Sequence, residues 1–94
     1  MIFMTDSFAY PLRPEWTTAE IITVSAFYTA VEKAYTQGIN QEEFMTKYQA
    51  YRQVVPAIMD QKQLDREFLE NSGFSIYQAT KVAQSNTKKT LRLS

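Results

Sequence analysis

The chain has 94 residues, of which 45% are hydrophobic and 14% aromatic, as expected for one small globular domain rather than a disordered chain. It contains no cysteine and no histidine, which excludes disulfides and thiolate chemistry and removes the commonest general base and metal ligand. We find no signal peptide and no run of about 20 apolar residues that could span a membrane, so we expect a cytoplasmic protein.

The charges balance over the whole chain but are unevenly distributed. Residues 1–70 hold all ten acidic and six of the ten basic residues, a net charge of −4. The remainder, residues 71–94, has a net charge of +4 and no acid; its basic residues are Lys81, Lys88, Lys89 and Arg92. We interpret this basic end as a solvated tail, and the alternative is that it guides association with a partner.

The N-terminal residues 1–16 predict an extended arm. Residues 1–9 are apolar without a clear period, and each proline in the segment 10–14 disfavours a helical conformation for the residue before it. We expect Tyr10 and Leu12 to pack against the bundle and Trp16, just before the first helix, to be a substantially buried anchor. A proline-rich ligand is the alternative, but one short segment without a repeat is weak evidence for it.

A long amphipathic helix is predicted at about residues 18–37. Thr17 and Glu20 fit a capping box, in which the threonine hydroxyl accepts from the Glu20 N–H and the carboxylate reaches back to the Thr17 N–H. Gly38 can take the left-handed conformation that ends a helix. Apolar side chains fall on one broad arc, so we expect this helix to be the central one. They are Ile21, Val24, Phe27, Tyr28, Val31, Ala34 and Tyr35.

A second helix is predicted at about residues 41–54. Asn40 and Glu43 form a second capping box, and Pro56 stops the helix. Because only three residues separate the first two helices, they must form an antiparallel hairpin.

Two shorter helices are predicted at about residues 61–72 and 76–86. A weaker capping box starts at Asp60, Gly73 ends the first of these helices at positive φ, and Ser75 caps the second. The apolar pattern fades beyond them, so we expect residues 87–94 to be flexible. The sequence therefore predicts one all-α domain over residues 1–94, a small four-helix bundle with an extended N-terminal arm.

Several short motifs, taken together in their order and spacing, resemble uncharacterised protein family 0223, a group of small cytoplasmic proteins of Gram-positive bacteria. The resemblance covers roughly residues 10–82 and implies an all-α fold without an assigned activity, so no functional residue can be transferred. The chain departs from the family pattern at Ala57–Met59, where polar residues and an acidic pair are expected, and at Phe74, where tyrosine is commoner. The motifs are Tyr10–Leu12, Trp16–Thr18, Val31–Tyr35, Gly38, Val54–Pro56 and Ser72–Ser75.

Tyr48, Tyr51 and Arg52 form the first candidate contact surface. Aromatic and arginine side chains one turn apart could stack on nucleic-acid bases or bind a peptide. The alternative is an aromatic core stripe at helical spacing, which needs no ligand.

Ile22, Ile58 and Met59 are the second set of candidate protein contacts. Ile22 projects into the polar face of the first helix, and the other two make the connection before the third helix apolar. They could lie under the N-terminal arm or mark a contact patch.

The sequence predicts no catalytic, cofactor-binding or metal-ligating residue. Our leading hypothesis is a non-catalytic protein that binds another protein or a second copy of itself, because catalytic groups are missing and apolar residues exceed what four short helices can bury. The alternative is a nucleic-acid-associated accessory protein that uses the basic tail with Tyr77 nearby, although the zero net charge argues against nucleic acid. An enzyme would need a pocket that holds a carboxylate with a raised pKa.

Overall fold

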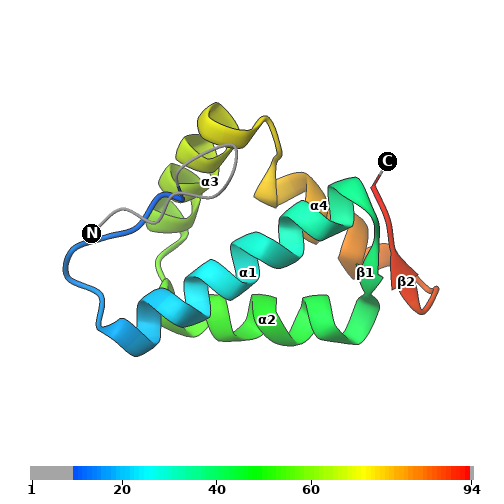
Figure 1. The fold of residues 1–94 in the computed structure, drawn as a ribbon, viewed down its shortest axis with the longest axis horizontal. Helices are drawn as coiled ribbons and strands as arrows, with labels where there is room; N and C mark the ends of the chain where they lie inside the picture. The colour runs from blue at the N-terminus through cyan, green and yellow to red at the C-terminus, as the bar shows by residue number, and fades with distance from the viewer. Residues whose placement is uncertain (1–9, 94) are drawn as a thin grey trace.

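The computed structural model of the protein describes residues 10–93, which form four helices and one two-stranded sheet. The helices α1 and α2 lie side by side as an antiparallel hairpin, and α3 and α4 complete an all-α bundle (Figure 1). The predicted fold class is therefore confirmed, with a small sheet added to it. The elements in chain order are α1 Thr18–Thr36, β1 Ile39–Asn40, α2 Gln41–Val54, α3 Ile58–Ser72, α4 Ile76–Ser85 and β2 Thr90–Leu91.

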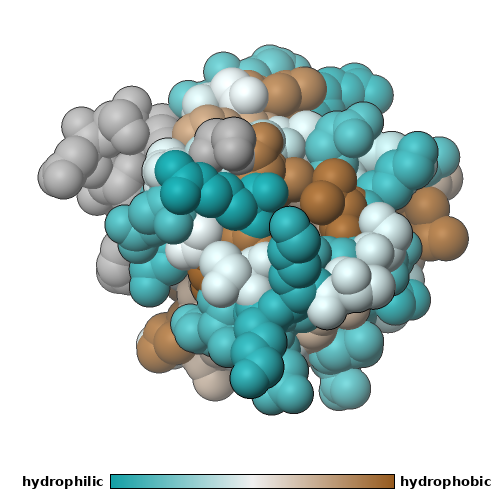
Figure 2. Space-filling model, turned by 90° about the vertical axis from the view of Figure 1, so that its right-hand side faces the viewer, coloured by the Kyte–Doolittle hydropathy of each residue, from teal (hydrophilic) through white to brown (hydrophobic). Residues whose placement is uncertain are grey.

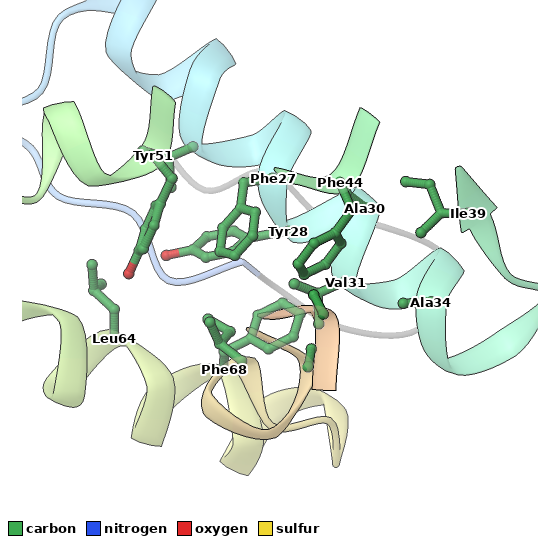
Figure 3. Close-up of a cluster of buried hydrophobic side chains, with 14 of the residues drawn as sticks. Phe27, Tyr28, Ala30, Val31, Ala34, Ile39, Phe44, Tyr51, Leu64 and Phe68 are labelled. Carbon is green, nitrogen blue, oxygen red and sulfur yellow. The ribbon is translucent and has the colours of Figure 1, made fainter. Parts of the chain in front are cut away.

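The hydrophobic core is organised around α1. Six of its residues are buried, and the aromatic rings among them point toward the neighbouring helices (Figure 3). The Phe27 ring stacks on Tyr51 of α2 at 4.6 Å, and the Tyr28 ring stacks on Phe68 of α3 at 4.9 Å. Offset stacking of this kind adds to the energy of burial, so α1 holds the other elements together. Its buried residues are Val24, Phe27, Tyr28, Ala30, Val31 and Ala34.

The ends of α1 follow the local signals in the sequence. The Glu20 N–H donates to the Thr17 hydroxyl at 3.2 Å, and the Thr17 N–H donates to the Glu20 carboxylate at 2.8 Å, which completes the capping box. Gly38 has φ of +92°, and its N–H donates to the carbonyl of Lys33 at 2.6 Å. The positive φ expected at this glycine is present because the backbone turns sharply toward β1.

Side-chain caps also start α2 and α4. The Glu43 N–H donates to the Asn40 side chain at 3.0 Å, and the Gln78 N–H donates to the Ser75 hydroxyl at 3.1 Å. Among the described helices, the reciprocal bond of a full capping box is formed only at α1. Gly73, at the end of α3, has φ of +82°, again as predicted.

The start of α3 differs from the prediction. The helix begins at Ile58, three residues before the expected start, and Ala57, the N-cap residue before it, provides no side-chain hydrogen bond. The capping box predicted at Asp60 is therefore wrong. Pro56, two residues before Ile58, has a backbone φ that its ring restricts. The Gln61 side chain donates to the Val55 carbonyl at 2.8 Å, which connects the first turn of α3 to the end of α2. The helix thus includes Ile58, whose side chain stays exposed.

The C-terminal tail is docked, which corrects the expectation of a flexible segment at residues 87–94. Strand β2 pairs antiparallel with β1, with Leu91 opposite Ile39. The Leu91 side chain is only 1% exposed, and the Leu93 N–H donates to the carbonyl of Ala34 at 2.8 Å. The entropy of ordering the tail is offset by backbone hydrogen bonds as well as by leucine burial.

Two amides, Gln41 and Asn86, organise the connection between α4 and β2. The Gln41 side chain donates to the carbonyl of Ala83 at 2.7 Å and accepts from the Asn86 side chain at 2.8 Å. The backbone N–H of Gln41 also donates to the carbonyl of Lys89 at 2.7 Å.

Viewed onto this end of the molecule, hydrophilic side chains surround a strip of hydrophobic ones (Figure 2).

The described part of the arm, residues 10–16, packs on α1 and α3. Tyr10 is buried, and the Tyr28 hydroxyl donates to the carbonyl of Pro11 at 2.9 Å. Leu12 and Trp16 are partly buried and pack against the core. Residues 1–9 of the predicted arm lie outside the described residues.

Candidate functional site

A groove between α2, α3 and α4 is the candidate site. It is open to solvent, encloses about 870 Å³, and each of the three helices contributes to its walls. Its size suits part of a polypeptide or a small ligand. The lining residues are Tyr48, Tyr51, Arg52, Ile58, Gln61, Lys62, Asp65, Ile76, Tyr77, Thr80, Lys81 and Gln84.

Two tyrosine–cation pairs line this groove, one on α2 and one on α4. Arg52 lies one helical turn after Tyr48, with its guanidinium carbon 5.6 Å from the ring centroid. Lys81 lies one turn after Tyr77, with its ammonium nitrogen 5.9 Å from that centroid. The i, i+4 spacing places each cation over a ring on the same helix face. The two helices therefore present matching aromatic and positive groups to one groove.

Asp65 joins α3 to the start of α4 at the wall of the groove. Its carboxylate oxygen accepts from the backbone N–H of Ile76 at 2.8 Å and from that of Tyr77 at 3.3 Å. These are the unpaired donors of the first turn of α4, where a negative charge is stabilised. The carboxylate therefore has a structural role in capping α4.

A stacked aromatic pair holds the connection between α3 and α4. The Tyr35 and Phe74 rings are nearly parallel, at 9°, with centroids 4.7 Å apart. The Tyr35 hydroxyl donates to the carbonyl of Ser75 at 2.9 Å, so both its ring and its hydroxyl hold the chain just before α4. This contact fixes the position of Tyr77 relative to the rest of the bundle.

Tyr51 lies against the core at the base of the groove. It is 1% exposed, and its hydroxyl has no hydrogen-bond partner among the described residues. Burial raises the pKa of this phenol well above its ordinary value. A buried hydroxyl without a hydrogen-bond partner lowers the stability of the folded state, so the Tyr51 hydroxyl is expected to be destabilising.

Apolar side chains are exposed beside the groove. Ile58 is 67% exposed and Tyr77 is 59% exposed, and both line the groove. Met59, adjacent to Ile58 in the first turn of α3, is 82% exposed. Large apolar groups left in water next to a groove mark a surface that gains free energy when it is covered.

The structure brings together four of the six candidate contact residues. Tyr48, Tyr51, Arg52 and Ile58 all line the groove, although the sequence placed them in two separate sets. Ile22 is 63% exposed on α1 and does not line it.

Tyr77 and Lys81 join the groove as well, although the sequence analysis associated them with the basic tail. Their i, i+4 spacing, repeated by Tyr48 and Arg52, is the signal that could have grouped the two pairs. Lys62 and Asp65 gave no such signal, because only the packing of α3 against α4 brings them to the groove.

Among the described residues, a carboxyl with a raised pKa and the groove lie in different places. Burial raises the pKa of Glu32, and a hydrogen bond from Tyr10 opposes that shift, but this carboxyl does not line the groove. Within residues 10–93, no group of three or more acidic, cysteine or histidine side chains could hold a metal ion.

Comparison with known proteins assigns the chain to a family. The model of the uncharacterised protein family UPF0223 matches residues 7–92, nearly the whole sequence. The chain belongs to the UPF0223 family. The resemblance found in the short motifs is therefore confirmed. In the described residues of this UPF0223 protein, no helix has the length and apolarity needed to cross a membrane.

Relatives of the chain occur in streptococci and lactococci. A UPF0223 protein of Streptococcus thermophilus strain CNRZ 1066 is 44% identical over 82 residues, which cover 87% of this chain and 88% of the relative. A UPF0223 protein of Lactococcus lactis subsp. cremoris strain MG1363 is 38% identical over 86 residues, 92% of each chain. One from Streptococcus sanguinis strain SK36 is 38% identical over 90 residues, 96% of this chain and 98% of the relative. The similarity thus extends over most of the length of each chain.

Proposed function

We propose that this UPF0223 protein is a non-catalytic cytoplasmic protein that binds another protein through the groove between α2, α3 and α4. The observation that carries the proposal is the exposure of Ile58 and Tyr77 on a groove that also holds two ring-stacked cations. Tyrosine and arginine are enriched where protein interfaces concentrate their binding energy. A partner that covers Ile58 and Tyr77 would remove their apolar surface from water. It would also contact Arg52 and Lys81, whose side chains are already positioned by the tyrosine rings.

The chemistry of the groove fits binding better than catalysis. Asp65, the one acidic side chain among its described lining residues, already caps α4 through two backbone N–H groups. A general acid or base would need a free group within reach of a substrate proton. The groove instead offers aromatic, aliphatic and positively charged surface.

A matched pair of substitutions tests the proposal. Ile58 and Ile22 are almost equally exposed, but only Ile58 lines the groove. Ile58→Asp should therefore abolish retention of a protein partner in a pull-down from lysate read by mass spectrometry, while Ile22→Asp should leave retention unchanged. Both variants should remain folded, because neither side chain contributes to the core.

Two results would count against the proposal. Equal retention by wild type and Ile58→Asp would show that the groove is not the contact surface. A wild-type chain that retains no protein and stays monomeric in light scattering would argue against protein binding altogether. Self-association would instead appear as a dimer that Ile58→Asp dissociates.

Nucleic-acid association is the second candidate. Lys88 and Lys89 are exposed in the connection before β2, and Tyr77 with Lys81 could stack on a base. Binding to DNA or RNA should then weaken steeply with salt and after Lys88→Ala with Lys89→Ala, which leaves the docked strand β2 in place. No binding at low salt would rule out this candidate.

A further inference from the structure

We infer that the groove between α2, α3 and α4 accepts an acidic segment of a partner protein that also presents apolar side chains. This inference rests on the proposed function and specifies its partner by chemistry. Its basis is the juxtaposition of three basic side chains, two tyrosine–cation pairs and the exposed Ile58 around a single groove.

The charge of the groove favours an acidic occupant. Arg52, Lys62 and Lys81 line it, and within residues 10–93 none of them forms a salt bridge with a carboxylate. Among the described residues that line the groove, the only acid is Asp65, and its oxygen already accepts two backbone hydrogen bonds. The groove therefore carries net positive charge in a chain whose formal net charge is zero. Carboxylates of a partner would complement it and form charge-assisted hydrogen bonds.

The ring-stacked cations also exclude a basic occupant. A positively charged ligand could form cation–π contacts with Tyr48 and Tyr77, but Arg52 and Lys81 already lie over those rings. It would also be repelled by both cations. The same stacking limits the side-chain motion of the two cations, which reduces the entropy lost when a carboxylate binds them.

The apolar contacts favour a polypeptide over nucleic acid. Ile58 offers an aliphatic surface that a leucine, isoleucine or phenylalanine side chain would cover, whereas a phosphate backbone gains nothing from it. Walls made of three helices suit an amphipathic segment that lays one apolar face in the groove and directs acidic side chains to its rim.

Selection from a display library of random peptides on the full chain tests the inference. Peptides enriched on the wild type should combine acidic with large apolar residues. They should bind a variant with Arg52→Glu and Lys81→Glu at least about tenfold more weakly. The matched control carries Lys33→Glu and Arg66→Glu, which make the same change in charge on exposed residues outside the groove, and it should bind like the wild type.

The outcomes separate the inference from the proposed function. Two results would contradict an acidic partner while still supporting binding in the groove. Peptides that fail to bind Ile58→Asp could lack acidic residues, or they could bind the variant with Arg52→Glu and Lys81→Glu as well as they bind the wild type. Enrichment that is equal on wild type and Ile58→Asp would overturn both, as would selective binding of single-stranded nucleic acid at the groove. Circular dichroism checks that the charge-reversed variant is folded. If it is not, Arg52→Gln with Lys81→Gln replaces it, and weaker binding of the acidic peptides is still required.

Discussion

Arg13 and Glu67 bind each other through two hydrogen bonds, of 3.1 and 2.7 Å, that join the N-terminal arm to α3. The pair brings together residues that are 54 positions apart in the chain. The two guanidinium nitrogens meet the two carboxylate oxygens, a geometry that is stronger and more specific than a single contact. The arm is thereby fixed across the side of the bundle.

The Arg13–Glu67 pair predicts a pH dependence of stability. Hydrogen bonding to Arg13 lowers the pKa of Glu67, so the folded state binds this proton more weakly than the unfolded state. The contribution is fully present above the unfolded pKa of about 4.3 and is lost as pH falls through the folded value. Because both side chains are partly exposed, Glu67→Gln should cost only about 0.5–1 kcal/mol at neutral pH. Urea melts over a pH series check this, and an equal cost at pH 7 and in strong acid would contradict it.

The two left-handed glycines should differ in their response to alanine. A Cβ at Gly38 would lie 3.3 Å from the Thr90 methyl group, whereas a Cβ at Gly73 would meet nothing within 4 Å. Gly73→Ala should cost about 1–2 kcal/mol for the left-handed backbone alone, and Gly38→Ala should cost more. Denaturant melts measure both. In a Thr90→Ser background, which lacks that methyl group, the excess cost at Gly38 should disappear, and its persistence there would mean that the contact with Thr90 is not its cause.

The docked tail should contribute strongly to stability. Leu91→Ala should cost about 2–5 kcal/mol, because it would leave a cavity under β2. A loss of about 2 kcal/mol corresponds to a fall in Tm of roughly 8 °C or more for a domain of this size. Thr87→Ala, at an exposed position, is the control. Calorimetry at two protein concentrations gives the answer: an unchanged Tm would mean that the tail is free, and a fall that depends on concentration would place the docking between chains.

Two buried tyrosines should respond in opposite ways to loss of the hydroxyl. Tyr28→Phe removes the hydrogen bond to the Pro11 carbonyl and leaves that acceptor unpaired, which should cost about 1–3 kcal/mol. Tyr51→Phe removes a buried hydroxyl that has no partner among the described residues, so stability should be unchanged or higher. Parallel denaturant melts compare the two variants. A clear loss of stability in Tyr51→Phe would reveal a hydrogen bond that the structure does not contain.

Local signals account for the parts of the fold that the sequence predicted. The Thr17 capping box, the Ser75 cap and the two left-handed glycines each depend on residues within one turn of the helix end. The hydrophobic arc of α1 likewise follows from helical geometry alone. Such features can be identified in a sequence because the groups that satisfy each other are neighbours in the chain.

Contacts between distant residues account for what the sequence did not predict. The tail is held by Gln41, Asn86 and the carbonyl of Ala34, and no local pattern links these to Leu91. The expectation of a flexible tail rested on the fading apolar pattern, which does not reveal these hydrogen bonds. The groove has the same origin, because α2, α3 and α4 supply Arg52, Lys62 and Lys81 separately.

Chemical-shift mapping would show directly whether a ligand binds in the groove between α2, α3 and α4. The isotope-labelled full chain would be titrated with a peptide enriched in the selection. We predict that shifted amides concentrate around Tyr48 on α2, Ile58 on α3 and Tyr77 on α4, while those around Ile22 stay in place. Shifts that concentrate on α1 around Ile22, or at the β1–β2 end of the molecule, would contradict the account.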